Sequence, residues 1–214
     1  MLTAERRLAL QYTLIFVAFP AIISLSKPRG WIYAVLWLMT AWTLALMRRK
    51  YNYVFRLDWN RRAVTRQVIK SILLRFLPFA AALLAFSWVM IPNHLFSLPL
   101  ERPGTWLMVM IWYPVLSVLP QELIFRSFFF RQYERWFATP AVGLAANAFA
   151  FGWLHIILQN WVAVVFSIIG GYLFADTYRK TRSLAAVSFE HALYGCFIFT
   201  IGLGQFFYHG QAVK

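Results

Sequence analysis

Residues 117–130 read SVLPQELIFRSFFF and place two charged side chains inside an almost wholly apolar run. Glu122 and Arg126 are four residues apart, so a helix brings them together on one face. Charged groups at membrane depth are costly unless they face the protein interior or water. The stretch therefore predicts a buried polar site inside a bundle of apolar helices.

The composition of the whole chain is typical of a membrane protein. Of 214 residues, 61% are hydrophobic and 13% are charged, whereas soluble proteins carry about 25% charged residues. Apolar runs of about 17 to 25 residues can cross a bilayer as helices. We expect an all-α fold, a polytopic transmembrane helix bundle of about seven spans, in a single membrane-embedded domain over residues 1–214. The expected spans are 8–25, 31–47, 71–92, 106 onward, 141–158, 161–175 and 184–203.

The net charge of +14 comes mostly from Lys and Arg residues in the short segments between apolar runs. This distribution indicates topology rather than nucleic-acid binding, because positively charged loops stay in the cytoplasm. The basic segment 48–70 fits a cytoplasmic loop that lies against anionic lipid headgroups. We expect the N-terminus in the cytoplasm, and membrane lipid but no nucleic acid as a partner. Cys196 is the only cysteine, which excludes an intrachain disulfide and a cage of thiolate ligands.

Two histidines on later apolar runs are candidate partners of Glu122. A chain reversal at 138–140 makes a helical hairpin in which Glu122 and His155 stand at nearly equal height. His191 lies about 12 Å inside the last run at about 1.5 Å per residue, a depth that Glu122 can share. Asn147 is eight residues before His155 and so lies on the same helix face. The sequence thus predicts that Glu122, His155 and His191 converge, with Asn147 nearby.

Neighbouring polar residues complete the predicted site. Gln121 is rotated about 100° from Glu122 on a helix and can border the same cavity. Glu190, next to His191, either enters the site or makes a local polar contact. Arg126 either holds the Glu122 carboxylate in place for chemistry or forms with it a structural ion pair and no more.

Three short segments resemble the motifs of a known family. They are QELIFR at 121–126, FGWLH at 151–155 and FEHALYG at 189–195. In order and spacing they are similar to Glu-Glu-x-x-x-Arg, Phe-x-x-x-His and His-x-x-x-Asn of the CPBP (CAAX protease and bacteriocin-processing, Abi-type) intramembrane proteases, which include the CAAX prenyl endopeptidases. The resemblance covers residues 106–203. It implies peptide-bond hydrolysis within a membrane, here the bacterial inner (plasma) membrane.

The resemblance implies a role for each site residue. Glu122 would be the general base or the carboxylate that orients water, His155 its partner in activating water, and His191 the oxyanion donor. The substrate would be a membrane-associated protein or peptide cleaved near the cytoplasmic face. The cofactor stays open, because Glu122, His155 and His191 would suit a divalent metal such as zinc and would equally serve a metal-free glutamate-type mechanism.

Two positions depart from the family pattern. Gln121 stands where the family has its first Glu, and an amide cannot take a proton from water at neutral pH. Gly195 stands in place of the Asn of the third motif. Either the protein is a catalytically inactive CPBP-like membrane scaffold or partner protein, or Glu122 or Glu190 supplies the carboxylate while a backbone N–H or His191 alone supports the oxyanion.

Two further classes of protein can use such residues. A b-type haem protein would take His155 and His191 as axial ligands, which leaves Glu122 and Arg126 without a role. A small transporter would line its path with the ion pair, although the sequence indicates no solute. We therefore favour an intramembrane endopeptidase.

Overall fold

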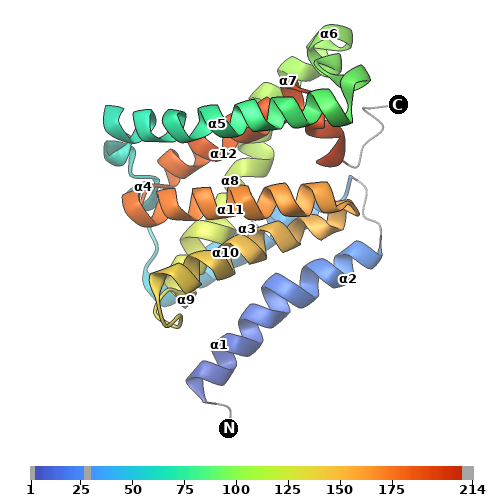
Figure 1. Ribbon diagram of the computed structural model, residues 1–214. Helices are drawn as coiled ribbons and strands as arrows, with labels where there is room; N and C mark the ends of the chain where they lie inside the picture. Colours follow the sequence, from blue (N-terminus) through green and yellow to red (C-terminus); the bar gives the residue numbers. More distant parts are fainter. Residues whose placement is uncertain (1–2, 27–29, 209–214) are drawn as a thin grey trace.

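The computed structural model describes residues 3–26 and 30–208 as a bundle of helices, with no β-strand in these two ranges. The predicted all-α fold is confirmed (Figure 1). The helices are α1 Ala4–Tyr12, α2 Phe19–Leu25, α3 Ile32–Tyr51, α4 Phe55–Trp59, α5 Arg66–Met90, α6 Ser97–Glu101, α7 Pro103–Tyr113, α8 Leu119–Glu122, α9 Phe129–Tyr133, α10 Pro140–Leu154, α11 Trp161–Thr181 and α12 Leu184–Thr200.

Within the described residues, 5 helical stretches are long and apolar enough to cross a membrane. Helix α12 is apolar but shorter, and α3 ends in a strongly basic last turn. The chain is therefore an integral membrane protein, while the count of about seven spans is not confirmed. A single domain over residues 1–214 stays a prediction. The 5 stretches are Ala4–Leu25, Arg66–Met90, Pro103–Tyr133, Pro140–Leu158 and Trp161–Thr181.

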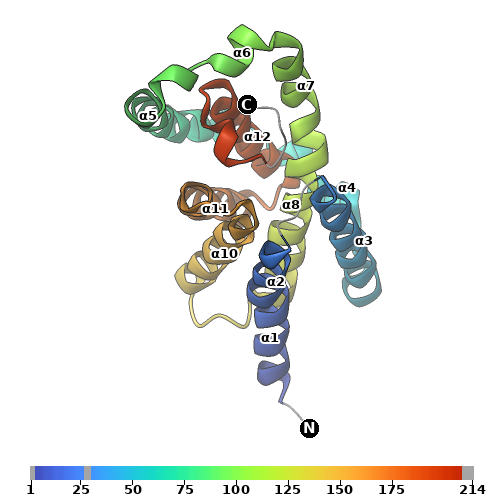
Figure 2. The same ribbon diagram turned by 90° about the vertical axis from the view of Figure 1, so that its right-hand side faces the viewer.

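The stretch quoted at the outset forms the central helix of the bundle. Every residue from 120 to 130 is buried, as expected for a helix that is apolar all round. The π-helical segment Leu123–Phe128 joins α8 to α9, and a second one, Pro114–Val118, joins α7 to α8. Figures 1 and 2 show α8 in the middle, with α3 on one side and α10 and α11 on the other. The charged pair on this helix is thus surrounded by protein.

Pro120 interrupts the hydrogen bonding of the central helix just before the charged pair. It has no N–H to donate, and the carbonyl of Leu116, one turn earlier, accepts a hydrogen bond from Trp37 Nε1 on α3 at 3.2 Å. The π-helical segments before and after Pro120 insert extra residues into their turns, a feature that is frequent at functional sites. The central helix is thereby tied to α3 where the polar site begins.

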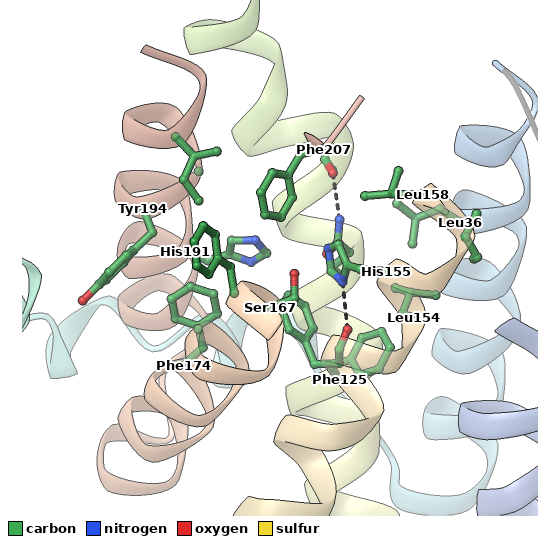
Figure 3. Close-up of a pocket in the computed structure, with 18 of the residues that line it drawn as sticks. Leu36, Phe125, Leu154, His155, Leu158, Ser167, Phe174, His191, Tyr194 and Phe207 are labelled. Atoms are coloured by element: carbon green, nitrogen blue, oxygen red, sulfur yellow. Dashed lines mark hydrogen bonds between the residues drawn. The ribbon is translucent and has the colours of Figure 1, made fainter. Parts of the chain in front are cut away.

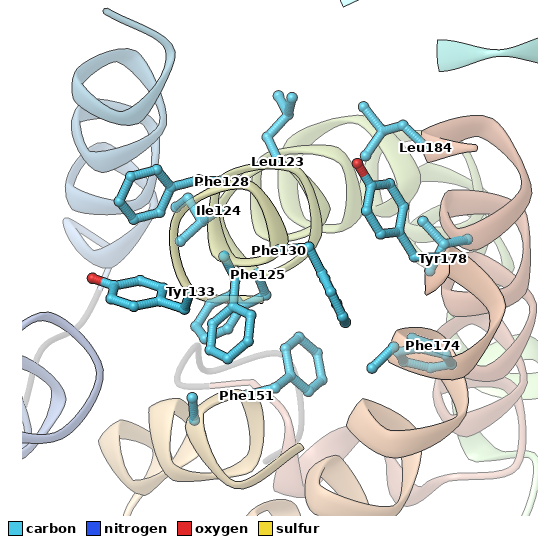
Figure 4. Close-up of a cluster of buried hydrophobic side chains, with 14 of the residues drawn as sticks. Leu123, Ile124, Phe125, Phe128, Phe130, Tyr133, Phe151, Phe174, Tyr178 and Leu184 are labelled. Carbon is cyan, nitrogen blue, oxygen red and sulfur yellow. The ribbon is translucent and has the colours of Figure 1, made fainter. Parts of the chain in front are cut away.

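Aromatic rings fill the space around the central helix (Figure 4). The ring centroids of Phe125 and Phe151 lie 5.3 Å apart, which joins the central helix to α10. Phe130 lies 5.6 Å from Tyr178 and so joins it to α11. Such pairs contribute about 0.5–1.5 kcal/mol each beyond the area they bury. They fix the central helix relative to α10, which leads to His155, and to α11, which contacts the helix of His191.

Helices α10 and α11 approach each other closely because glycines lie in their contact. A Cβ atom on Gly152 would be 2.2 Å from the Ile168 side chain and 2.8 Å from the Ile168 backbone nitrogen. Small residues let helix backbones come together in this way inside membranes. The predicted chain reversal is present, since α10 begins at Pro140 with Thr139 as its N-cap. His155 follows α10 directly and begins the short 3-10 segment His155–Leu158, which contacts both helices.

The basic loop after α3 folds against the bundle around one buried acid. Asp58 of α4 is 4% exposed and accepts hydrogen bonds from the hydroxyls of Tyr178 at 2.6 Å, Tyr53 at 3.0 Å and Ser127. Arg131 lies 3.3 Å from the same carboxylate. Burial raises the pKa of Tyr53, and the charge of Asp58 raises it further. The loop is therefore anchored to the central helix and to α11 through Asp58.

Candidate active site

The centre of the candidate site is the Glu122 carboxylate on the central helix. Glu122 is 0% exposed. Its Oε1 accepts a hydrogen bond from Nδ1 of His191 on α12 at 2.8 Å. Its Oε2 lies 3.0 Å from Nε of Arg126, one turn further along. The carboxylate is therefore held between a guanidinium group and an imidazole.

Helix α10 fixes the Arg126 guanidinium group from the other side. Arg126 Nη1 donates to Asn147 Oδ1 at 2.6 Å, and Asn147 Nδ2 donates to the carbonyl of Phe125 at 2.6 Å. The guanidinium carbon lies 4.9 Å from the centre of the Phe151 ring, which is within reach of a cation–π interaction. Arg126 is thus held in one position, and Asn147 contacts the site through it.

His191 connects the buried carboxylate to a cavity. Its ring stacks on Phe174 of α11 with 4.6 Å between centroids, and its Nε2 lies 3.1 Å from the hydroxyl oxygen of Tyr113. When Glu122 is ionised and the imidazole is neutral, Nδ1 carries the proton toward the carboxylate and Nε2 keeps a lone pair. Both ring nitrogens are engaged, which disagrees with the haem alternative.

His155 and His191 face one cavity of about 970 Å³. Figure 3 shows the two imidazoles side by side, with the Ser167 hydroxyl near the gap between them. Nδ1 of His155 donates to the carbonyl of Phe151 at 2.9 Å, which fixes its ring. The Phe151 ring lies 5.1 Å from His155 and 5.4 Å from His191 between centroids. Side chains of α2, α3, α5 and α12 close the cavity with mainly apolar groups.

Gln121 and Glu190 occupy different places. Gln121 lines the cavity, and its Nε2 donates to Ser117 Oγ at 2.8 Å. Its Oε1 has no hydrogen-bond partner among the described residues. Glu190 is buried and lies 3.1 Å from Arg75 of α5, and it is not among the described residues that line the cavity. Of the two alternatives for Glu190, the structure shows the local polar contact, which is made with Arg75.

The partner of Glu122 differs from the one expected. The family resemblance made His155 the partner of Glu122, but the carboxylate accepts its hydrogen bond from His191, the other histidine that the sequence offered. Helix α12 passes directly beside the central helix, whereas His155 lies beyond α10 and faces the cavity. Glu122 is itself not among the described lining residues. It therefore reaches the cavity only through His191.

Glu122, His155 and His191 do not fit a shared metal ion. A zinc site needs at least three protein ligands around one point. The parts of the chain that the structure describes hold no group of three His, Cys, Asp or Glu side chains placed to bind an ion. Glu122 Oε1 and His191 Nδ1 bond to each other instead of pointing to a common centre. No step of the proposed chemistry is therefore assigned to a metal.

Sequence reasoning missed several hydroxyl groups on the cavity wall, and three of them lie near the site. Tyr113, Ser117 and Ser167 all line it, and none of them lies in the three family-like motifs. A hydroxyl in an apolar run is common enough that its type alone indicates nothing. The one available signal was Gly195, because a missing side chain in the third motif leaves room for a group from elsewhere.

Comparison with known proteins finds a family model that matches the motif-bearing segment. Residues 103–197 match the family model described as type II CAAX prenyl endopeptidase Rce1-like. No curated protein and no solved structure matches the chain. The matched segment contains all the predicted site residues, from Gln121 to His191. The resemblance to the CPBP intramembrane proteases is thereby confirmed over these residues, and the chain is a CAAX-protease-like integral membrane protein.

Proposed function

We propose that this protein is an intramembrane endopeptidase that hydrolyses peptide bonds of a membrane-associated protein or peptide near the cytoplasmic face. The observation that carries the proposal is the 2.8 Å hydrogen bond between His191 Nδ1 and Glu122 Oε1, with His191 on the wall of a cavity. Hydrolases use a buried carboxylate in this way to orient an imidazole as a base. The match of residues 103–197 to an endopeptidase family supports the same reaction class.

In this proposal His191 moves the proton and Glu122 is a positioning residue. Glu122 keeps the His191 proton on Nδ1, so that the Nε2 lone pair can accept the proton that the attacking water gives up. The water oxygen bonds to the substrate carbonyl carbon. When the carbon–nitrogen bond breaks, the proton held by His191 passes to the leaving nitrogen. His155 and Gln121, on the same cavity wall, orient the water and the carbonyl group.

Cleavage of membrane-spanning reporter peptides tests this proposal. The purified protein is reconstituted with a pool of such peptides in phosphatidylethanolamine–phosphatidylglycerol vesicles, and new peptide termini are measured by mass spectrometry. We expect turnover by the wild type and a loss of about 10²–10⁴-fold in His191→Ala, the size typical of a lost general base. His94→Ala is the matched control, because that imidazole is exposed in the loop after α5. Cleavage that persists in His191→Ala, or no cleavage at all, overturns the proposal.

A second candidate function is a membrane scaffold that lacks chemistry. The observation in its favour is Gln121, whose amide is bound to Ser117 in the place of the first Glu of the family motif. The substitution Gln121→Glu separates the two candidates, with Gln67→Glu on the exposed face of α5 as its control. A silent wild type that gains cleavage through Gln121→Glu alone supports the scaffold. A wild type with turnover that depends on His191 excludes it.

The proposed orientation has the N-terminus and the basic loop after α3 in the cytoplasm. The support for it is the positive charge of that loop, which the cell retains on the cytoplasmic side. A single reporter cysteine at Arg49, in a Cys196→Ser background, would be labelled by a membrane-impermeant maleimide only in inside-out vesicles. Labelling in right-side-out vesicles would reverse the assignment.

A further inference from the structure

Gly195 lies inside helix α12, at the position of the third motif where the family carries Asn. Glycine in a helix interior is destabilising by about 0.5–1 kcal/mol relative to alanine, so its presence calls for a local reason. A Cβ atom on Gly195 would lie 2.3 Å from both Cε1 and the hydroxyl oxygen of Tyr113. The volume that an Asn side chain would fill is therefore occupied by the Tyr113 ring and its hydroxyl group.

Two features of the chain hold Tyr113 in this volume. It is the last residue of α7, directly before Pro114 and the π-helical segment that leads to the site. Its ring packs edge-on against Phe199 of α12 at 5.3 Å between centroids. The hydroxyl is thereby directed at His191, whose Nε2 is 3.1 Å away. Tyr113 also lines the cavity.

Glu122, His191 and Tyr113 form one chain of hydrogen bonds that ends at the cavity. The carboxylate accepts from Nδ1–H of His191, so the Nε2 lone pair accepts from the Tyr113 hydroxyl. The lone pairs of the Tyr113 oxygen then remain for a hydrogen bond from water in the cavity. A proton that leaves this water can pass to the Tyr113 oxygen while the Tyr113 proton passes to Nε2.

We propose that Tyr113 is a catalytic residue that takes the place of the side chain missing at position 195. This inference rests on the proposed peptidase function. As the water oxygen bonds to the carbonyl carbon, Tyr113 receives the water proton and gives its own to His191, so it stays neutral. Its renewed O–H group then donates to the negative oxygen of the tetrahedral intermediate, the task that the resemblance assigns to the third motif.

The substitution Tyr113→Phe removes only the hydroxyl group and keeps the ring beside Gly195, so the packing is retained. Turnover of the reporter peptides should fall by about 10²–10³-fold in kcat with KM unchanged, the size seen when one oxyanion donor is lost. Tyr172→Phe is the matched control, because Tyr172 is 47% exposed on α11. A KM that rises while kcat stays constant would indicate substrate contact alone and would overturn the proposal.

A double variant that moves the hydrogen-bond donor from position 113 to position 195 tests whether Tyr113 replaces the missing Asn side chain. Gly195→Asn alone collides with Tyr113, and Tyr113→Ala alone lacks the donor. The double variant Tyr113→Ala/Gly195→Asn restores both space and donor, so its kcat should exceed that of Tyr113→Ala by at least about 10-fold, a part of what one such donor supplies. Thermal unfolding of each variant separates loss of fold from loss of turnover.

The outcomes distinguish this inference from the function on which it rests. Turnover that depends on His191 and is unchanged in Tyr113→Phe overturns the role of Tyr113 alone. If the wild type shows no turnover, or shows turnover that persists in His191→Ala, both the peptidase function and the role of Tyr113 are overturned. Turnover that falls in Tyr113→Phe, in a variant whose unfolding temperature matches that of the wild type, supports both.

Discussion

Replacing Arg126 with methionine tests how far the stability of the bundle depends on its buried charges. The change removes the ion pair with Glu122 at 3.0 Å and the hydrogen bond to Asn147 at 2.6 Å. Both charged side chains are 0% exposed, so the Glu122 carboxylate is left without a cation and without water. Breaking a buried pair in this way costs about 3–5 kcal/mol. For a chain of this size the unfolding temperature should fall by about 6–20 °C.

A double variant gives the result that would refute this reasoning. In Glu122→Gln/Arg126→Met no charge is left unpaired. The loss of unfolding free energy should therefore be smaller, by at least about 1 kcal/mol, than the sum of the losses in the two single variants. Unfolding is followed by tryptophan fluorescence in detergent micelles. Arg49→Met, at an exposed position of α3, should change stability by less than about 0.5 kcal/mol. A loss under about 1 kcal/mol in Arg126→Met, or strictly additive single losses, would contradict the argument.

Three further predictions concern the fold around the site. Gly152→Ala should destabilise the protein by about 1–3 kcal/mol through collision with the Ile168 backbone, whereas Gly104→Ala, with no atom within 4 Å of its Cβ, should be tolerated in the same thermal unfolding assay. Because the pKa of Tyr53 is raised in the folded protein, the contribution of Tyr53 to stability should be constant below about pH 10 and should decline above it as the unfolded tyrosine ionises. In urea titrations above about pH 10, the unfolding free energy of Tyr53→Phe should therefore fall less steeply with pH than that of the wild type, by up to the slope that one proton gives. Asp58→Ala should cost about 3–5 kcal/mol by leaving a cation and three hydroxyls without their acceptor, and an unchanged urea midpoint would refute this.

The sequence was sufficient for features that depend on local spacing. The pairing of Glu122 with Arg126 follows from a separation of four residues on one helix. The buried central helix follows from an apolar run without a polar face, and the start of α10 follows from Pro140. In each case one segment and its own periodicity determine the outcome, so no knowledge of neighbouring helices is needed.

Features that depend on which helices are neighbours could not be predicted in the same way. Equal depth in the membrane allowed Glu122 to meet either histidine, and the choice of His191 depends on the path of α12 beside the central helix. Asp58 is the only acid in the basic segment 48–70, yet its burial also depends on the hydroxyls of Ser127 and Tyr178, which are distant in sequence. Tyr113 fits beside His191 only because Gly195 has no side chain, and the spacing of residues along the sequence does not reveal this.

The buried charges also bear on whether the protein catalyses a reaction or serves as a scaffold. A buried ion pair contributes little net stability, because well-packed apolar residues in its place are often neutral or stabilising by about 1–4 kcal/mol. A bundle that only binds a partner therefore has no need of Glu122 and Arg126. In this protein Arg126 and Asn147 hold the Glu122 carboxylate against Nδ1 of one imidazole, that of His191, at the wall of a cavity. An imidazole must keep one tautomer to exchange protons in a fixed direction, and this requirement favours the peptidase.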